Sequence, residues 1–131
     1  MIDFRLSERS GVPTYLQLVH QVRQAIRLGL VQPGDQLPTV KEVVGKLAIN
    51  PNTVLKAYRE LDHEGLVEGR RGQGTFVSDT LPRSEPSDYV ALRTALLRWI
   101  ERARDAGLDE EAISAIFGAV VQAAFVEDKV A

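Results

Sequence analysis

The chain has 131 residues, 44% of them hydrophobic, which is enough for one folded core or two small ones and excludes a disordered tail. It has no cysteine, no N-terminal secretion signal and no apolar run of about eighteen residues, so we expect a cytoplasmic protein without disulfides or a membrane span. The net charge of −2 argues against nucleic-acid binding. However, residues 1–79 carry ten basic and nine acidic side chains, while residues 80–131 carry six basic and nine acidic ones. The acidic excess therefore lies in the C-terminal part.

The first predicted helix follows the dipeptide Pro13-Thr14. Apolar residues recur at helical spacing at positions 15, 19, 22, 26 and 30, and a Pro-Gly turn signal at 33–34 ends the segment. A second helix begins at Thr39, because Thr39 and Glu42 match the capping box, in which each side chain satisfies a free backbone N–H group of the other residue. This helix is short, since a new helix start follows at residue 50.

The third predicted helix has a marked start and a marked end. Asn50 is suited to cap its N-terminus, Pro51 to occupy its first position, and Gly65 to take the left-handed conformation after its last turn. From residue 66 the pattern changes to two short β segments, 66–70 and 75–78, around a flexible tip at 71–74. Three helices followed by a hairpin are the order of a winged helix-turn-helix.

Residues 80–87 contain two prolines and two serines, which is typical of a linker between domains. Two helical patterns follow, one through residues 89–103 and one through residues 113–124, separated by a Gly-Leu-Asp segment at 107–109. We therefore predict a mainly α fold with a small β-hairpin (α+β). It consists of an N-terminal winged helix-turn-helix domain (1–79), a linker (80–87) and a C-terminal antiparallel helical hairpin (88–131).

The third helix is predicted to have a buried and a polar side. At about 100° per residue, the apolar side contains Val54, Tyr58 and Leu61, and the opposite side contains Asn52, Lys56, Arg59 and His63. A helix that follows its predecessor after a short turn can lie in the major groove of DNA with its early residues at the bases. Asn52 can then pair with adenine, and Thr53 can bond to a base or a phosphate. The cations of Lys56 and Arg59 suit phosphates or guanine. Leu55, beside this side, either touches a thymine methyl group or packs on the second helix.

The hairpin tip is a second candidate contact. Arg70 and Arg71 precede the small segment 72–74, so the tip can enter a minor groove or lie along phosphates without steric conflict. Taken alone, a polar helix face is usually only solvated, and a hairpin with two arginines is usually only a hairpin. Found together in this order, the two features favour DNA binding. The competing hypothesis is a protein-interaction module, in which the winged fold binds a partner and the acidic helices drive assembly.

Several blocks of sequence at matching spacing resemble the GntR family of bacterial regulators. The resemblance covers roughly residues 4–78, and the blocks are Pro13-Thr-Tyr15 with Gln17, Pro33-Gly34-Asp35 with Leu37-Pro38, Asn50-Pro-Asn-Thr-Val54, Lys56-Ala-Tyr58, and Glu64-Gly-Leu-Val67 through Arg71-Gly-Gln-Gly-Thr-Phe-Val77.

The family resemblance implies DNA contacts from the start of the second helix, the start of the third helix and the wing tip, which corresponds to Lys41, Asn52, Thr53, Arg71 and Gly72. Lys41 stands where the family often has arginine, and lysine cannot form a bidentate guanidinium contact, so we expect it at a phosphate. Pro51 stands where many members have a further arginine. The complete predicted DNA-binding set is Lys41, Asn50, Asn52, Thr53, Lys56, Arg59, Arg70, Arg71, Gly72 and Gln73.

The short C-terminal part resembles the YtrA subfamily, whose two-helix tail mediates dimerisation. Two helices cannot wall a ligand pocket of about 300–1,000 Å³, and the apolar face of the last helix is wider than one partner helix would cover. We therefore expect a second copy of the chain to cover it in a two-fold dimer. The alternative is that the helices fold back onto the winged domain. The predicted dimerisation residues are Leu92, Leu96, Trp99, Ile100, Ile113, Ile116, Phe117, Val120, Val121 and Ala124.

Catalysis is not expected. The two histidines, His20 and His63, belong to no cluster with metal-ligand spacing, and the glycine-rich stretch 69–74 lacks the strand-to-helix context of a phosphate loop. We expect neither a cofactor nor a metal. The sequence therefore predicts a homodimeric regulator of double-stranded DNA that reads a pseudo-palindromic operator, with its recognition helices about 34 Å apart or a multiple of that distance. The resemblance implies repression of a transporter-type operon, and no residue indicates a small-molecule effector.

Overall fold

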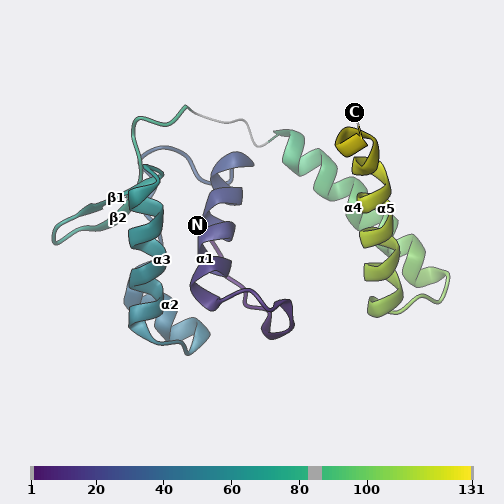
Figure 1. The fold of residues 1–131 in the computed structure, drawn as a ribbon, viewed down its shortest axis with the longest axis horizontal. Helices are drawn as coiled ribbons and strands as arrows, with labels where there is room; N and C mark the ends of the chain where they lie inside the picture. The colour runs from purple at the N-terminus through teal and green to yellow at the C-terminus, as the bar shows by residue number, and fades with distance from the viewer. Residues whose placement is uncertain (1, 83–86, 131) are drawn as a thin grey trace. The chain divides into compact units, whose positions relative to one another are not determined.

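The computed structural model describes residues 2–82 and 87–130, and the chain divides into two compact units, Met1–Pro86 and Ser87–Ala131. Within the described residues the first unit contains the 3-10 helix η1 (Glu8–Ser10), the helices α1 (Thr14–Arg27), α2 (Val40–Leu47) and α3 (Pro51–His63), and the strands β1 (Val67–Arg70) and β2 (Gly74–Val77). The second unit contains α4 (Ser87–Asp105) and α5 (Glu110–Val130) (Figure 1). The predicted mainly α fold with a small β-hairpin is confirmed.

The starts of α2 and α3 are fixed by local side-chain caps. The Glu42 backbone N–H donates to Thr39 Oγ1 at 3.1 Å, and the Thr39 N–H donates to Glu42 Oε1 at 3.3 Å, which completes the capping box. Asn50 Oδ1 accepts from the Asn52 N–H at 2.8 Å, and Pro51 is the first helical residue. After α3, Gly65 has a φ of +80°, as predicted for a residue just past a helix end.

Helix α1 ends one turn earlier than its apolar pattern indicates. The pattern continues to Leu30, but the helix ends at Arg27, and Gly29 adopts a left-handed φ of +73°. The placement of Leu30 on the buried face is therefore wrong, because the chain has already turned and the side chain is 44% exposed. The buried residue after the helix is Val31, at 4% exposure.

The core of the first unit lies mainly between α1 and α3. Its fully buried side chains come from both helices, from the segment before α2 and from β2, and the largest are Leu18, Leu37, Leu61, Val19, Val22, Val54 and Val77. Residues 2–12, for which the sequence pattern predicts no structure, also contribute, because Phe4 is 3% exposed within this core. Gln21 on α1 fixes that segment: its Nε2 donates to the Arg5 carbonyl at 2.6 Å, and its Oε1 accepts from the Arg5 N–H at 2.9 Å.

The wing is an antiparallel hairpin in which Val67 pairs with Val77 and Arg70 with Gly74. Residues 34–37 run along the outer side of β2, where the Leu37 N–H donates to the Thr75 carbonyl at 2.8 Å and the Val77 N–H donates to the Asp35 carbonyl at 2.8 Å. The hairpin lies beside α3 and extends away from α1 (Figure 1). A third stretch of backbone therefore supports the base of the wing.

The predicted linker is only partly open chain. Leu81 is half-buried against the core of the first unit, and Ser87 is already the first residue of α4. Residues 83–86 of the predicted linker lie outside the described residues. In the second unit, Asp109 Oδ1 accepts from the Ala112 N–H at 2.9 Å and so caps the start of α5, next to the acidic pair Glu110 and Glu111.

Candidate nucleic-acid interface

Helix α3 turns its polar side outward. Val54, Ala57, Tyr58 and Leu61 are buried against the core, while the side chains on the opposite side, Asn52, Lys56, Arg59 and His63, are all exposed. Leu55, beside them, is 41% exposed and does not belong to the side chains packed against the core. The exposed side of α3 is therefore available to a partner.

The position of α3 depends on a buried tyrosine. Tyr58 Oη donates a 2.6 Å hydrogen bond to the carbonyl of Pro38, in the segment that leads into α2. Burial raises the pKa of the Tyr58 hydroxyl well above its ordinary value, and the nearby Glu42 carboxylate raises it further. The hydroxyl therefore stays neutral and remains a donor, which ties the middle of α3 to the start of α2.

The first turn of α3 presents Asn52 and Thr53 next to the cap. Asn50 uses its side-chain oxygen to cap the helix, so its amide NH₂ group is the part left to donate to a phosphate. Thr53 is half-buried, and Asn52 is exposed. The preceding Ala48 has a left-handed φ of +54°, which produces the sharp turn between α2 and α3.

Lys56 has a neighbour that sequence reasoning missed. Its Nζ lies 4.0 Å from the centroid of the Tyr15 ring, on the first turn of α1. The periodic pattern puts Tyr15 on the apolar face of the first helix, and the ring is half-buried against the core while it also contacts this cation. Tyr15 therefore holds the Lys56 ammonium close to the first turn of α1. Periodicity indicates that the ring packs inward, but it does not indicate that the ring also contacts a cation.

Two further cations are open to solvent. Lys41 is exposed at the second position of α2, and Arg59 is exposed on α3. Neither side chain makes an ion pair with any residue that the structure describes. Both are therefore free to contact an anion.

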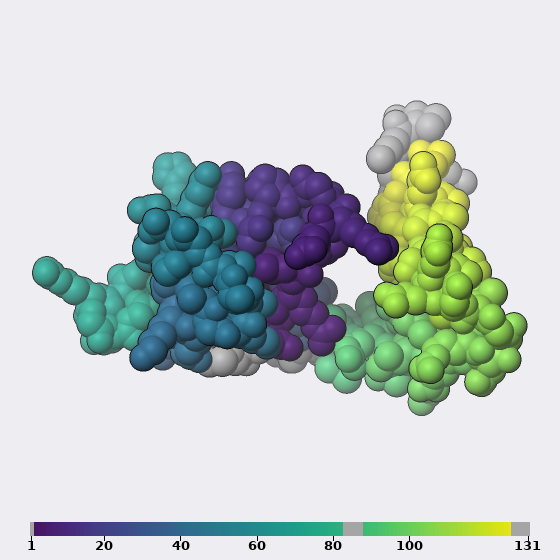
Figure 2. All heavy atoms as spheres, turned by 90° about the horizontal axis from the view of Figure 1, so that it is seen from below, coloured from purple at the N-terminus to yellow at the C-terminus, as the bar shows by residue number. Residues whose placement is uncertain are grey.

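The wing tip projects as a narrow arm, the teal segment that extends from the first unit in Figure 2. Arg71, Gly72 and Gln73 are exposed there, and Gly72 has a φ of +76°, which favours glycine. Gln36 Nε2 donates to the Gln73 carbonyl at 3.1 Å, so Gln36 holds the wing tip in place. A shallow hollow of about 550 Å³ is lined by the tip and by Thr39, the cap of α2, which brings these two predicted contact regions together.

Arg70 differs from Arg71. Its guanidinium donates to Glu68 Oε1 at 2.9 Å and to Asp79 Oδ2 at 3.0 Å, and it lies 4.3 Å from the centroid of the Phe76 ring. The hydrogen bond to Glu68 raises the pKa of the Arg70 guanidinium, and the charges of Glu68 and Asp79 act in the same direction. In this structure Arg70 braces the base of the wing, and Arg71 is the arginine presented to a partner.

The tail helices expose most of the predicted dimerisation residues. Trp99, Ile100 and Ile113 are half-buried, and Ala124 is exposed. The larger exposed side chains of that set are Leu92 (69%), Leu96 (39%), Ile116 (40%), Phe117 (47%), Val120 (60%) and Val121 (41%). Val90, Leu97, Phe125 and Val126 are exposed as well and extend the apolar surface beyond the predicted set.

Other kinds of site have little support. Among the side chains that the structure describes, no three histidine, aspartate or glutamate residues are grouped as metal ligands would be. In the same part of the chain, no helix combines the length and the hydropathy needed to cross a lipid bilayer.

Comparison with known proteins identifies relatives. Residues 14–77 match the family described as "Bacterial regulatory proteins, gntR family". The chain is 43% identical over 75 residues to the HTH-type transcriptional repressor YtrA of Bacillus subtilis (strain 168), an alignment that covers 57% of this chain and 58% of that protein. It is 39% identical over 104 residues to the HTH-type transcriptional regulator Rv1152 of Mycobacterium tuberculosis (strain ATCC 25618 / H37Rv), covering 79% of this chain and 82% of the relative.

Solved structures agree with these relatives. YtrA from Sulfolobus acidocaldarius, described as a GntR-family transcription factor, superposes with a TM-score of 0.53 at 29% identity over 90% of this chain and 96% of that one. The DNA-binding domain of AraR in complex with operator ORE1 superposes with a TM-score of 0.50 at 27% identity, over 60% of this chain and 95% of that one.

Proposed function

Because this chain belongs to the GntR family of bacterial regulatory proteins, and so is a DNA-binding transcriptional regulator and not an enzyme, we propose that it represses a transporter-type operon as a homodimer bound to a pseudo-palindromic operator. The observation that carries the proposal is the exposed polar side of α3 beside the projecting wing. The relative YtrA of Bacillus subtilis is itself a transcriptional repressor. A protein that binds an operator on the bacterial chromosome acts in the cytoplasm, so the proposal includes a cytoplasmic location.

In this proposal α3 reads bases in the major groove. Asn52 is exposed on the first turn and offers a paired donor and acceptor to adenine, and Thr53 bonds to a base or a phosphate. Lys56 and Arg59 lie further along the same side, where they neutralise phosphates or contact guanine. Leu55, at 41% exposure, is available to a thymine methyl group.

The flanking contacts come from α2 and the wing. Lys41 at the start of α2 binds a phosphate as a point charge. Arg71 and Gly72 enter the minor groove or follow the phosphates beside it, with Gln73 held in place by Gln36. Arg70 reaches DNA only if it exchanges Glu68 or Asp79 for a phosphate, so we assign it a supporting role.

The tail forms the proposed dimer. Six of the predicted dimerisation side chains are large apolar groups that are 39–69% exposed, a degree of exposure that is unfavourable in water and is relieved when a second copy covers them. A two-fold dimer then presents two α3 helices to successive major grooves, about 34 Å apart or a multiple of that distance, which requires an operator with matching half-sites.

Selection of bound fragments from the source genome tests the proposal and identifies the regulated genes. We expect an enriched motif with two inverted half-sites upstream of transporter genes. On that motif, Lys56→Ala reduces the slope of log binding constant against log salt concentration by about 0.9 for each phosphate that loses its contact. A dimer has two copies of Lys56, so the expected reduction is about 1.8. The control is Arg27→Ala, in the last turn of α1, which leaves the slope unchanged. No enriched motif, or equal slopes for both variants, contradicts the proposal.

A further inference from the structure

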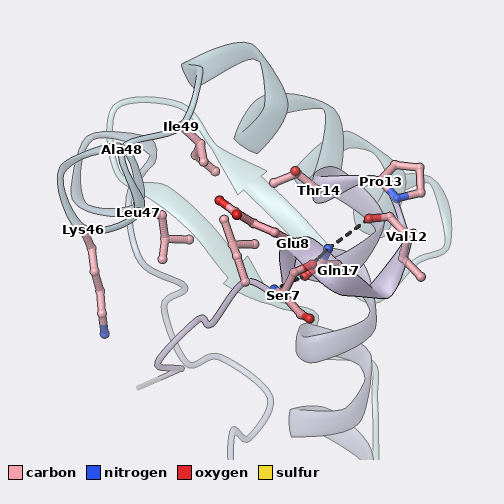
Figure 3. Close-up of a pocket in the computed structure, with 12 residues that line it drawn as sticks. Ser7, Glu8, Val12, Pro13, Thr14, Gln17, Lys46, Leu47, Ala48 and Ile49 are labelled. Carbon is pink, nitrogen blue, oxygen red and sulfur yellow. Dashed lines mark hydrogen bonds between the residues drawn. The ribbon is translucent and has the colours of Figure 1, made fainter.

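A cavity of about 830 Å³ lies beside the turn between α2 and α3, and we call it the turn cavity (Figure 3). One wall is formed by the segment around η1 and the start of α1, and the other wall by residues 46–49. The side chains that matter for its chemistry are the apolar Leu6, Val12, Leu47 and Ile49 and the polar Glu8 and Thr14. None of them belongs to the predicted DNA-binding set.

The wall around η1 is held in place by hydrogen bonds from one side chain, the amide of Gln17. Gln17 Oε1 accepts from the Ser7 N–H at 2.8 Å, while Gln17 Nε2 donates to the carbonyls of Ser7 and Val12, each at 2.9 Å. The amide of Gln17 therefore clamps both ends of the segment 7–12. The cavity is preformed, as small-molecule sites usually are.

The chemistry of the turn cavity favours a cation with an apolar body. Leu6, Val12, Leu47 and Ile49 are each half-buried and line it with aliphatic surface. The Glu8 carboxylate points from η1 toward Leu47 and Ile49 in Figure 3 and makes no ion pair with a described residue. The other charged group of the lining, Lys46, is paired with Asp3. The cavity therefore presents the negative charge of Glu8, which has no ion-pair partner among the described residues, beside four aliphatic side chains in a lining that also has many polar groups.

The cavity also touches the element that places α3. Ala48 and Ile49 lie immediately before Asn50, which caps α3, and Ala48 holds a left-handed conformation that is unfavourable for alanine. A ligand that contacts Leu47 and Ile49 acts on this turn. We propose that the turn cavity binds a small organic cation with an apolar body, and that its occupation changes the affinity of α3 for the operator. The second half of this statement rests on the proposed function, and the first half does not.

The binding half is tested on the full chain by NMR titration, with 2-phenylethylammonium as the probe and 2-phenylethanol as its neutral counterpart. We expect the ammonium to shift backbone signals of residues 7–14 and 46–50 and to bind several-fold more tightly than the alcohol. Glu8→Gln weakens the binding of 2-phenylethylammonium by about threefold, the effect of one exposed ion pair, and leaves the affinity for 2-phenylethanol unchanged. Glu111→Gln, an exposed carboxylate at the start of α5, is the matched control and changes neither. The proposed binding site is wrong if no backbone signals shift, if the shifts occur at other residues, or if the two probes bind with equal affinity.

The coupling half is tested by measuring operator affinity with and without saturating 2-phenylethylammonium. A shift of about threefold or more in the operator Kd, lost in Glu8→Gln, supports the coupling, and by linkage the operator then shifts the probe Kd by the same factor. If the operator Kd is unchanged while the cavity is occupied, the coupling is wrong and the binding site itself is unaffected by that result. Operator binding without the probe tests the proposed function separately, and Glu8→Gln leaves it unchanged.

Discussion

Replacing Tyr58 with phenylalanine removes one hydroxyl from the contact that ties α3 to the segment leading into α2. The side chain is 6% exposed, and its Oη donates to the Pro38 carbonyl at 2.6 Å. Phenylalanine keeps the ring and its packing but leaves this buried carbonyl without the donor. We expect Tyr58→Phe to lower the free energy of unfolding at neutral pH by about 1–3 kcal/mol, the cost of an unsatisfied buried polar group.

Because of the same hydroxyl, the difference in free energy of unfolding between the wild type and Tyr58→Phe depends on pH. Burial raises the pKa of Tyr58 in the folded protein above its ordinary value of 10.0, so above pH 10 the unfolded chain loses this proton while the folded protein keeps it. The unfolded state then binds fewer protons, and stability falls as pH rises. At about pH 11 this loss amounts to about 1.4 kcal/mol in the wild type and is absent in Tyr58→Phe.

Urea unfolding followed by circular dichroism measures both effects, with the two proteins at one fixed concentration because the proposed dimer makes stability depend on concentration. The variant is expected to be less stable at neutral pH. The difference in free energy of unfolding between the two proteins is expected to narrow by about 1.4 kcal/mol between about pH 9 and pH 11. If this difference stays constant between about pH 9 and pH 11, the Tyr58 hydroxyl is not a buried donor that remains neutral, and the reasoning is refuted.

Four further results are expected. Arg71→Ala reduces the salt slope of operator binding by about 0.9 per phosphate in a titration of Kd against salt, and an unchanged slope removes Arg71 from the interface. Asn52→Ala relaxes the preference at one base pair per half-site by about 1–3 kcal/mol in competition binding, whereas a uniform loss on all sequences makes it a positioning contact. Ala48→Gly, at a left-handed φ of +54°, raises the free energy of unfolding by up to about 1 kcal/mol in urea, and a loss of stability contradicts the strain. Deletion of residues 88–131 gives a folded monomer in sedimentation with weaker operator binding, and a truncated dimer excludes the tail as the interface.

Local signals predicted the local structure well. The capping box of α2 and the Asn50-Pro51 start of α3 each involve residues a few positions apart, so their hydrogen bonds follow from the sequence alone. The exposed side of α3 followed from helical geometry in the same way. Where a local breaker overrode the pattern, as Gly29 did before Leu30, periodicity extended the helix too far.

Contacts between distant residues could not be predicted. Gln21 binds the backbone of Arg5 across sixteen positions, and Gln36 binds Gln73 across thirty-seven. No period or spacing encodes such pairs, so the N-terminal segment and the support of the wing tip were missed. The same reason separates Arg70 from Arg71: the sequence shows two adjacent arginines, and only the fold places Asp79 beside the first of them.

Site-directed cleavage of the operator tests the central claim most directly, because the chain has no cysteine and a single one can carry an iron chelate. With the chelate at Gln73→Cys on the wing tip, we expect cuts in the operator at symmetric positions in the two half-sites. With the chelate at Gln24→Cys, an exposed position on α1, we expect none. Cleavage from position 24 without cleavage from position 73 would show that another face of the protein meets DNA and would contradict the account.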